Sequence, residues 1–205
     1  MKTNYEEIHN LLIIKSSKIE EVKYQIIKNG VIKIKKQKID LFCFITKTII
    51  SQQISDNVAQ LIWNKFCSYF ENDKPSLKKI PNINFFKNIL LNIGISKRKI
   101  AYITNFYNIS KSNLINEDVL EKKSESDFRD QLKKNPGIGR WTCDMTLIFF
   151  FQRLNIYPKN DLVIEKVKKR LCEIEKKEIK FDKIFCPYLS IFSLHLWEMS
   201  KRVLK

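Results

Sequence analysis

Two of the four glycines in this 205-residue chain fall in one short turn, Pro136-Gly137-Ile138-Gly139. Proline ends the helix predicted before the turn, because the residue preceding a proline disfavours helical geometry. The two glycines allow backbone angles that other residues avoid, and Ile138 between them can pack back into a core. A long apolar segment follows. The pattern predicts two helices joined by a tight turn, with free amides at the start of the second helix.

The rest of the sequence also favours helices. Only four glycines and five prolines occur, and clean alternation of apolar and polar residues is missing. Residues 31–39 alternate apolar residues with lysine and are compatible with a short strand or a loop. The spacing of apolar residues predicts helices over 17–28, 40–51, 55–70, 83–92, 96–110, 117–122, 127–134, 141–153, 162–175 and 188–204.

We therefore expect an all-α protein made of two helical lobes that carry a helix-hairpin-helix motif. One lobe spans about residues 46–135, and the other combines residues 1–45 with residues 136–205. No sharp linker or repeat marks a boundary, so the chain is treated as a single functional unit.

The formal net charge is +16, from 38 Lys and Arg against 22 Asp and Glu. A basic globular protein is attracted to polyanions, nucleic acid first and anionic membranes second. An AT-rich coding sequence, which enriches Lys, Asn and Ile, accounts for about half of this signal. The charge alone supports a nucleic-acid partner only weakly.

The cysteines are odd in number, scattered and without a C-x-x-C pair: Cys43, Cys67, Cys143, Cys172 and Cys186. This argues against a zinc site, an iron–sulfur cluster and a disulfide framework, and it favours a reducing compartment. The N-terminus shows no signal peptide, and the most apolar stretch, 145–151, is too short to span a bilayer. We expect a soluble intracellular protein, in the bacterial cytoplasm and nucleoid or in a eukaryotic nucleus.

The turn at 136–139 has the chemistry of a phosphate site. Free N–H groups and the positive end of the helix dipole favour an anion, and no side chain blocks its approach. Such a site reads no base, so it suits DNA of any sequence. The alternative is an ordinary helix–turn–helix corner. The preceding Leu-x-x-x-Pro and the long apolar helix after the turn favour the DNA interpretation.

The segment 132–150, LKKNPGIGRWTCDMTLIFF, resembles the hairpin of the helix-hairpin-helix, Gly/Pro-rich, Asp-containing DNA glycosylase superfamily. Trp141-Thr142 after Gly-x-Gly-Arg resembles its 3-methyladenine DNA glycosylase II branch. The resemblance covers roughly residues 40–201 and implies an active-site cleft between the two lobes. It implies DNA contacts from the hairpin residues Gly137, Ile138, Gly139 and Thr142. It also implies a possible structural Na⁺ or K⁺ on the main-chain carbonyls of Lys133, Asn135 and Ile138.

Asp161 falls where the resembled superfamily carries its catalytic aspartate, in the loop that opens a new helix. Breaking an N-glycosidic bond builds positive charge on the sugar, which one carboxylate can stabilise while it orients a water. An alkylated purine is already cationic and leaves readily, so no general acid is required. Aspartate is also a favoured N-cap, and both roles are compatible. Neither histidine, His9 or His195, is assigned to catalysis.

Trp141 stands where bifunctional relatives carry a Schiff-base lysine, so the resemblance implies no strand-cleaving AP-lyase activity. An indole face also attracts a cationic base, by about 0.5–2 kcal/mol. The segment 187–197 resembles the same branch, and Trp197 and Tyr188 are both assigned to the base pocket. Leu189 departs from the Arg that the family often has there. The alternative for either tryptophan is a core residue.

The turn Ser51-Gln52-Gln53-Ile54-Ser55 resembles the family's wedge, which fills the gap left by a flipped base. Gln53 is the first candidate wedge and Gln52 the second, with Ser55 beside them. The alternative is a polar helix–helix corner capped by Ser55. Residues 91–99 resemble a further family turn, with Gly94 after one helix and Ser96 capping the next. We interpret that turn as mainly structural.

Together these features predict a monofunctional glycosylase that acts as a monomer on double-stranded DNA containing damaged bases. Its substrates are alkylated purines of the 3-methyladenine and 7-methylguanine type, and it needs no cofactor beyond the possible hairpin cation. A catalytically inert DNA-binding protein and a glycosylase-lyase are the alternatives. Other bases, such as hypoxanthine, ethenoadenine and 1-methyladenine, stay open as substrates.

Overall fold

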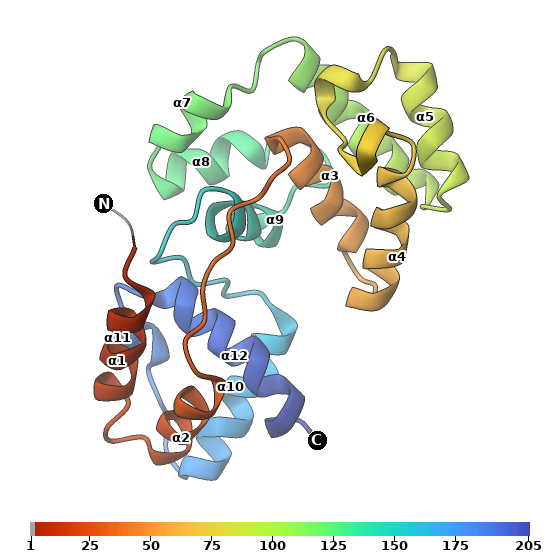
Figure 1. Ribbon diagram of the computed structural model, residues 1–205. Coiled ribbons are helices and arrows are strands. Elements are labelled where there is room, and N and C mark those ends of the chain that lie inside the picture. Colours follow the sequence, from red (N-terminus) through yellow and green to blue (C-terminus); the bar gives the residue numbers. More distant parts are fainter. Residues whose placement is uncertain (1–2) are drawn as a thin grey trace. The chain divides into compact units, whose positions relative to one another are not determined.

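The computed structural model describes residues 3–205, and every regular element in that range is helical (Figure 1). The expected all-α fold class is confirmed. Residues 31–39, which the sequence left between strand and loop, are irregular. The chain divides into two compact units. Unit 1 combines the described residues up to Lys35 with Leu147–Lys205, and unit 2 is Lys36–Thr146.

Unit 2 is built around α3, a helix whose apolar residues lie on nearly all sides and are buried. It packs against α4, α6 and α9, and α9 packs against α8. Phe42 of α3 contacts the rings of Phe86 and Phe106, at centroid distances of 5.5 and 5.9 Å. The elements of this unit are α3 (Leu41–Ser51), α4 (Asp56–Cys67), the 3₁₀ turns η1 (Glu71–Asp73) and η2 (Leu77–Lys79), α5 (Ile83–Asn92), α6 (Lys97–Lys111), α7 (Glu117–Lys122), α8 (Glu125–Leu132) and α9 (Arg140–Met145).

Unit 1 is centred on α10 and α12, which lie side by side (Figure 1). Its core includes Phe185 and Phe192, whose rings stack at a centroid distance of 3.7 Å. The elements that make up this unit are α1 (Tyr5–Lys15), α2 (Glu20–Asn29), α10 (Leu162–Glu175), α11 (Phe181–Phe185) and α12 (Leu189–Val203). A π-helical turn, η3 (Thr146–Phe150), continues directly from α9 into unit 1.

The structure differs from the sequence expectations in several places. Helices α1 and α11 were not predicted, although Asn4 caps α1 and Ile8 and Leu12 are buried in it. Instead of one helix over 141–153, α9 changes to a π turn at Thr146. The units divide at 35/36 and 146/147 rather than near 45/46 and 135/136, because the hairpin and α9 pack against α3 and α8.

Helix boundaries elsewhere follow local capping chemistry. The side chains of Asp40, Ser55 and Ser96 accept backbone N–H groups at the starts of α3, α4 and α6. Gly94, with φ = +79°, ends the turn before α6, as its sequence position predicted. Within residues 3–205, no helix combines the length and apolar character needed to cross a membrane.

Candidate functional site

The hairpin lies between the end of α8 at Leu132 and the start of α9 at Arg140. Gly137 adopts φ = +84°, and a Cβ atom there would collide with the Tyr102 ring. This position therefore requires glycine both for its backbone angle and for the close approach of α6. Ile138 is only 3 % exposed, which confirms that its side chain packs back into the core. Any contact of Ile138 with a phosphate is limited to its backbone.

A second group of contacts ties the hairpin to the turn after α3. The side-chain amide of Gln52 donates to the carbonyl of Gly137 and to the hydroxyl of Thr142, both at 3.0 Å. Thr142 is 1 % exposed, so its side chain is unavailable for the DNA contact predicted from the sequence. Gln52, the second wedge candidate, thus connects the turn after α3 to the hairpin through its side-chain amide.

Gln53 differs from its neighbour in both conformation and exposure. It adopts φ = +59°, in the left-handed region, and its side chain is exposed. Of the two wedge candidates, Gln53 is thus the one presented to solvent. Ser55 is exposed and caps α4 with a hydrogen bond of 3.4 Å to the N–H of Val58, so the structural alternative for Ser55 holds.

Lys99, on the first turn of α6, holds the end of α3. Its Nζ donates to the carbonyl oxygens of Ile50, at 2.6 Å, and of Gln52, at 2.8 Å. These carbonyls lie past the end of the helical hydrogen-bonding pattern, where a cation is favourable. Burial and the neighbouring Arg98 lower the pKa of Lys99. These contacts agree with the interpretation of residues 91–99 as a mainly structural turn, because Lys99 binds carbonyl groups within unit 2.

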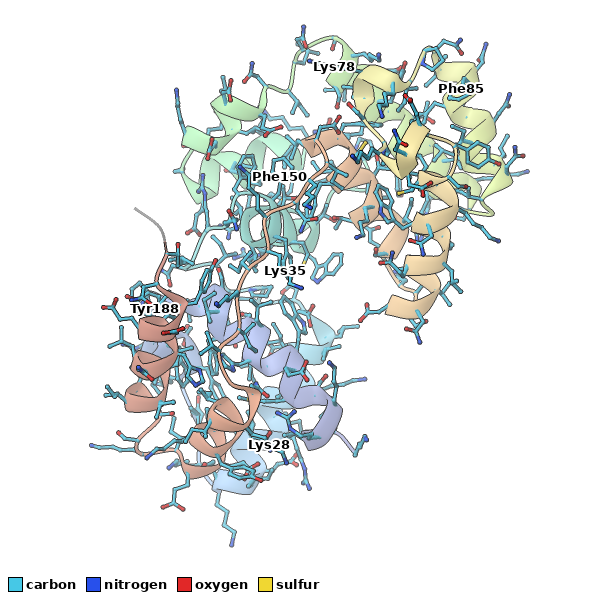
Figure 2. The ribbon with its side chains drawn as sticks, in the orientation of Figure 1. Lys28, Lys35, Lys78, Phe85, Phe150 and Tyr188 are labelled. Carbon is cyan, nitrogen blue, oxygen red and sulfur yellow. The ribbon has the colours of Figure 1, made fainter. Side chains whose placement is uncertain are left out.

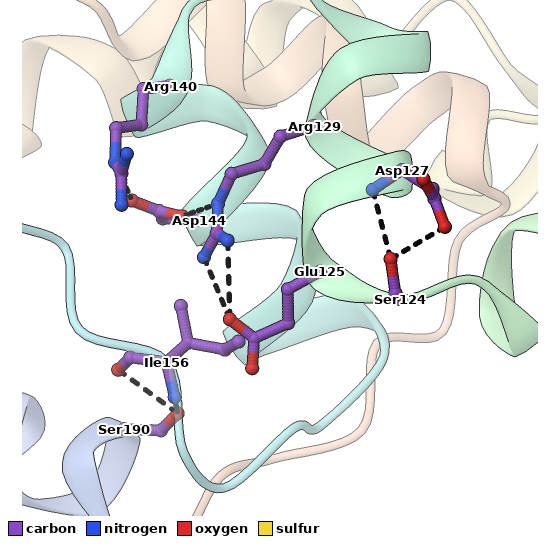
Figure 3. A network of polar contacts seen from close by, with 8 residues as sticks. All are labelled: Ser124, Glu125, Asp127, Arg129, Arg140, Asp144, Ile156 and Ser190. Atoms are coloured by element: carbon purple, nitrogen blue, oxygen red, sulfur yellow. Dashed lines mark hydrogen bonds and ion pairs between the residues drawn. The ribbon is translucent and has the colours of Figure 1, made fainter.

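A buried ion pair braces the two hairpin helices against each other (Figure 3). Arg129 of α8 donates from Nε to Asp144 of α9 at 2.8 Å and contacts Glu125 at 3.2 Å. Arg140 approaches the second oxygen of Asp144 at 3.7 Å. Burial raises the pKa of Asp144, and Arg129 opposes that effect. Sequence reasoning missed this brace, although a lone carboxylate inside the apolar run after the hairpin was a visible signal.

Asp161 lies in unit 1, where it is the N-cap of α10 and 7 % exposed. Its Oδ1 accepts the backbone N–H groups of Val163 and Ile164, each at 3.0 Å. The indole N–H of Trp197, on α12, donates to the same oxygen at 3.1 Å. Two residues predicted to share a site thus meet directly.

Tyr188, also predicted for the pocket, lies at the start of α12 (Figure 2). Trp197 follows nine positions later, a rise of about 13 Å along the helix axis. The structure therefore does not bring Tyr188 to Trp197. Trp141, Gly137 and Gly139 belong to unit 2, and Gly139 is the N-cap of α9.

The loop before Asp161 is fastened to α12 by Ser190, a residue that sequence reasoning did not single out. The Ser190 hydroxyl accepts the N–H of Ile156 at 2.9 Å (Figure 3), and its backbone N–H donates to Leu154. These contacts fix the segment that leads into the N-terminus of α10. The carboxylate is thereby held by its own helix and by the chain before it.

The two histidines stack on each other in unit 1, with ring centroids 5.7 Å apart. The Asn29 side chain lies 3.0 Å from His195 Nδ1. Burial and the neighbouring His9 lower the pKa of His195 to about 3, so the ring stays neutral at physiological pH. This environment suits a structural pair, in agreement with assigning neither histidine to catalysis.

Comparison with known proteins identifies relatives over most of the chain. A family model described as HhH-GPD superfamily base excision DNA repair protein matches residues 46–185. DNA-3-methyladenine glycosylase 1 of Schizosaccharomyces pombe is 31% identical over 162 residues, which are 76% of this chain and 70% of that protein. Alkylbase DNA glycosidase-like protein mag2 of the same yeast is 32% identical over 169 residues, which are 77% of this chain and 76% of its own.

The fold has a solved counterpart as well. The structure of S. pombe 3-methyladenine DNA glycosylase (Mag1) in complex with abasic DNA superposes with a TM-score of 0.81 and 24% sequence identity. The match covers 95% of this chain and 97% of that one. At this identity the likeness establishes the shared fold, and the roles of individual residues rest on their own geometry.

Proposed function

Because this chain belongs to the HhH-GPD superfamily of base excision DNA repair proteins, we propose that it is a monofunctional DNA glycosylase acting on alkylated purines. The observation that carries the proposal is Asp161, a buried carboxylate fixed by three N–H donors at the start of α10. The name of one yeast relative favours 3-methyladenine as a substrate, and the name of the other favours alkylated bases in general.

The reaction replaces a C1′–N bond with a C1′–O bond. The bonding electrons leave with the cationic base, which becomes neutral, and positive charge develops on the sugar. The Asp161 carboxylate stabilises that charge and orients the attacking water, whose proton is released. The products are a free base and an abasic site. Trp141 occupies the position where a Schiff-base amine would stand, so the strand stays intact.

The remaining parts of the DNA-binding apparatus lie in unit 2. The backbone at Gly137 and Gly139 would grip a phosphate, and exposed Gln53 would fill the space left by the extruded base. We infer that the partner is double-stranded DNA containing damaged bases, and the net charge of +16 agrees with a polyanionic partner. We infer that the protein acts as a monomer in the cellular compartment that holds DNA.

We also infer that the hairpin holds a Na⁺ or K⁺ ion through the carbonyls of Lys133, Asn135 and Ile138. Neutral carbonyl oxygens suit a hard monovalent cation. The Asn135 carbonyl accepts one N–H, from Ile138 at 3.1 Å, which leaves its second lone pair for an ion. The ion would stiffen the turn. DNA affinity should be higher in K⁺ than in tetramethylammonium at equal ionic strength.

The decisive experiment incubates the protein with methylated duplex DNA and identifies released bases by liquid chromatography. We expect free 3-methyladenine or 7-methylguanine and abasic sites in uncut strands. Asp161→Asn should lower the single-turnover rate by about 10²–10³-fold, the usual loss when one electrostatic stabiliser is removed. It should leave affinity for lesion-containing DNA nearly unchanged.

The matched control is Asn160→Ala, which changes the polar residue directly before Asp161 in the same loop. This variant should retain activity. Two outcomes would contradict the proposal. DNA binding without release of any base from a panel of lesions would indicate an inert DNA-binding protein. Trapping of a covalent adduct by borohydride would indicate a glycosylase-lyase.

A further inference from the structure

The wedge turn, residues 51–55 after α3, contains a strained residue. Gln53, the first wedge candidate, adopts φ = +59°, in the left-handed region that favours glycine. Residues other than glycine keep such an angle only where the surrounding structure fixes it. The contacts that hold the wedge turn therefore determine where the exposed Gln53 side chain points.

Gln52, directly before Gln53, is fixed from two sides. Its backbone carbonyl accepts a hydrogen bond of 2.8 Å from Nζ of Lys99, which lies on the first turn of α6. Its side-chain amide donates to the Gly137 carbonyl of the hairpin at 3.0 Å. Lys99 also binds the Ile50 carbonyl, at 2.6 Å. The chain that enters the wedge turn is thus held at successive positions.

One face of α6 contacts both the wedge turn and the hairpin. Lys99 and Tyr102 are three residues apart on this helix, so their side chains lie on the same face. Lys99 binds the wedge turn, and the Tyr102 ring lies against Gly137 of the hairpin. Because a helix is rigid over a single turn, α6 fixes the distance between these two segments of unit 2.

We propose that Lys99 is a positioning residue for Gln53: by binding two carbonyls at the end of α3, it holds the wedge turn so that the Gln53 side chain fills the space that an extruded base leaves. A wedge that is already ordered loses little conformational entropy on entering the duplex, which favours extrusion. The inference rests on the proposed glycosylase function and names what orients its wedge.

A lysine suits this task for electrostatic reasons. The last carbonyls of a helix form the negative end of its dipole, where a cation is favourable. The ammonium group has three N–H donors, so it can bind both carbonyls at once. Lys99 is half-buried, and burial together with the neighbouring Arg98 lowers its pKa. Its side chain therefore lies against the unit and holds the turn from within.

The first experiment is a double-mutant cycle on base release. Lys99→Met keeps an unbranched apolar side chain and removes the ammonium, and Gln53→Ala removes the wedge side chain. Each change alone should lower the single-turnover rate on methylated DNA by about tenfold. If Lys99 acts through Gln53, the double variant should lie within about twofold of the slower single variant. Two losses that multiply would overturn the inference.

The matched control is Lys111→Met, on the same helix. Lys111 Nζ donates to the Ile80 carbonyl at 3.2 Å, so it makes the same kind of contact at the other end of α6. This variant should keep the wild-type rate. Lys99→Arg retains a cation with several N–H donors and should keep most of the rate. A loss in Lys111→Met or Lys99→Arg as large as in Lys99→Met would contradict the proposed role.

Fluorescence reports the extrusion step itself. A duplex with 2-aminopurine next to 7-methylguanine brightens when the neighbouring base leaves the stack. The rise that precedes base release should be smaller in Lys99→Met than in the wild type, and it should be retained in Lys111→Met. A full rise in Lys99→Met would show that the wedge works without this lysine.

Melting temperatures test the contact without reference to activity. Gln53→Gly removes the strain of the left-handed angle and should raise the melting temperature by about 2 °C. In the Lys99→Met background the turn is no longer held at that angle, so this gain should disappear. An equal gain in both backgrounds would overturn the inference. A wild-type protein that releases no base would instead overturn the proposed function, and the melting temperatures would still decide whether Lys99 fixes the turn.

Discussion

Position 137 requires glycine for two separate reasons, its backbone angle and the close approach of a neighbouring ring. Alanine there would adopt a left-handed angle, which costs roughly 1–2 kcal/mol. Its Cβ would also collide with the Tyr102 ring of α6. We expect Gly137→Ala to lower the melting temperature by about 4 °C or more and to weaken binding to undamaged duplex DNA.

Gly94→Ala separates the two effects, because Gly94 has φ = +79° but no atom within 4 Å of a Cβ. This control should show the backbone strain alone, with DNA affinity unchanged. Equal losses of stability at both positions, measured by thermal unfolding, would mean that the contact with Tyr102 contributes nothing.

Single residues were predictable where a motif fixed their position, and less so where their role depends on a partner. Asp161 and Trp197 were identified from the sequence, and the structure joins them by a hydrogen bond. Gln52 and Gln53 are adjacent and chemically identical, and only their position in the resembled motif ranked Gln53 before Gln52. The fold adds the physical difference: Gln52 turns toward the hairpin, whereas Gln53 faces solvent.

At the scale of elements, the hairpin depends on helices that lie far from it in sequence. Helix α6 places the Tyr102 ring against Gly137. The same helix carries Lys99, which donates a hydrogen bond to the Ile50 carbonyl at the end of α3. The turn after α3 supplies Gln52, which donates to the hairpin carbonyl. The periodicity of apolar residues predicted these helices well, because it reports their buried faces. It could not reveal the polar ties, since those residues lie at helix ends where periodicity stops.

The ion pair between α8 and α9 leads to a prediction about stability. Arg129→Met would leave Asp144, whose side chain is 1 % exposed, as a buried charge without its main partner. Breaking such a pair costs about 3–5 kcal/mol, so the urea midpoint should fall sharply. Asp144→Leu added to Arg129→Met should recover much of the loss, because the pair is then replaced by apolar groups. Arg170→Met, in an exposed pair with Glu173, is the control and should change stability by about 1 kcal/mol or less.

At the scale of the whole molecule, the all-α class followed from few helix breakers and from helical spacing. The boundaries of the two units could not be predicted from the sequence, because packing between helices sets them rather than composition. Thr146 lies inside an apolar run, and nothing in that run marks the passage from unit 2 to unit 1. Helix α1 was missed for a related reason: its short amphipathic pattern buries only Ile8 and Leu12.

The net charge of +16 has two explanations. Either the lysines bind DNA, or an AT-rich coding sequence has enriched lysine without any role in binding. Salt dependence separates these explanations, because each phosphate neutralised contributes about 0.9 to the slope of log K against log salt. Lys134 is exposed beside the hairpin, so Lys134→Ala should reduce the slope by about that amount. Lys201 of α12 is paired with Glu198, and Lys201→Ala should leave the slope unchanged. If both variants reduced the slope equally, the lysine beside the hairpin would contribute no more to DNA binding than a lysine elsewhere on the surface. The prediction that the hairpin binds the DNA backbone would then be wrong.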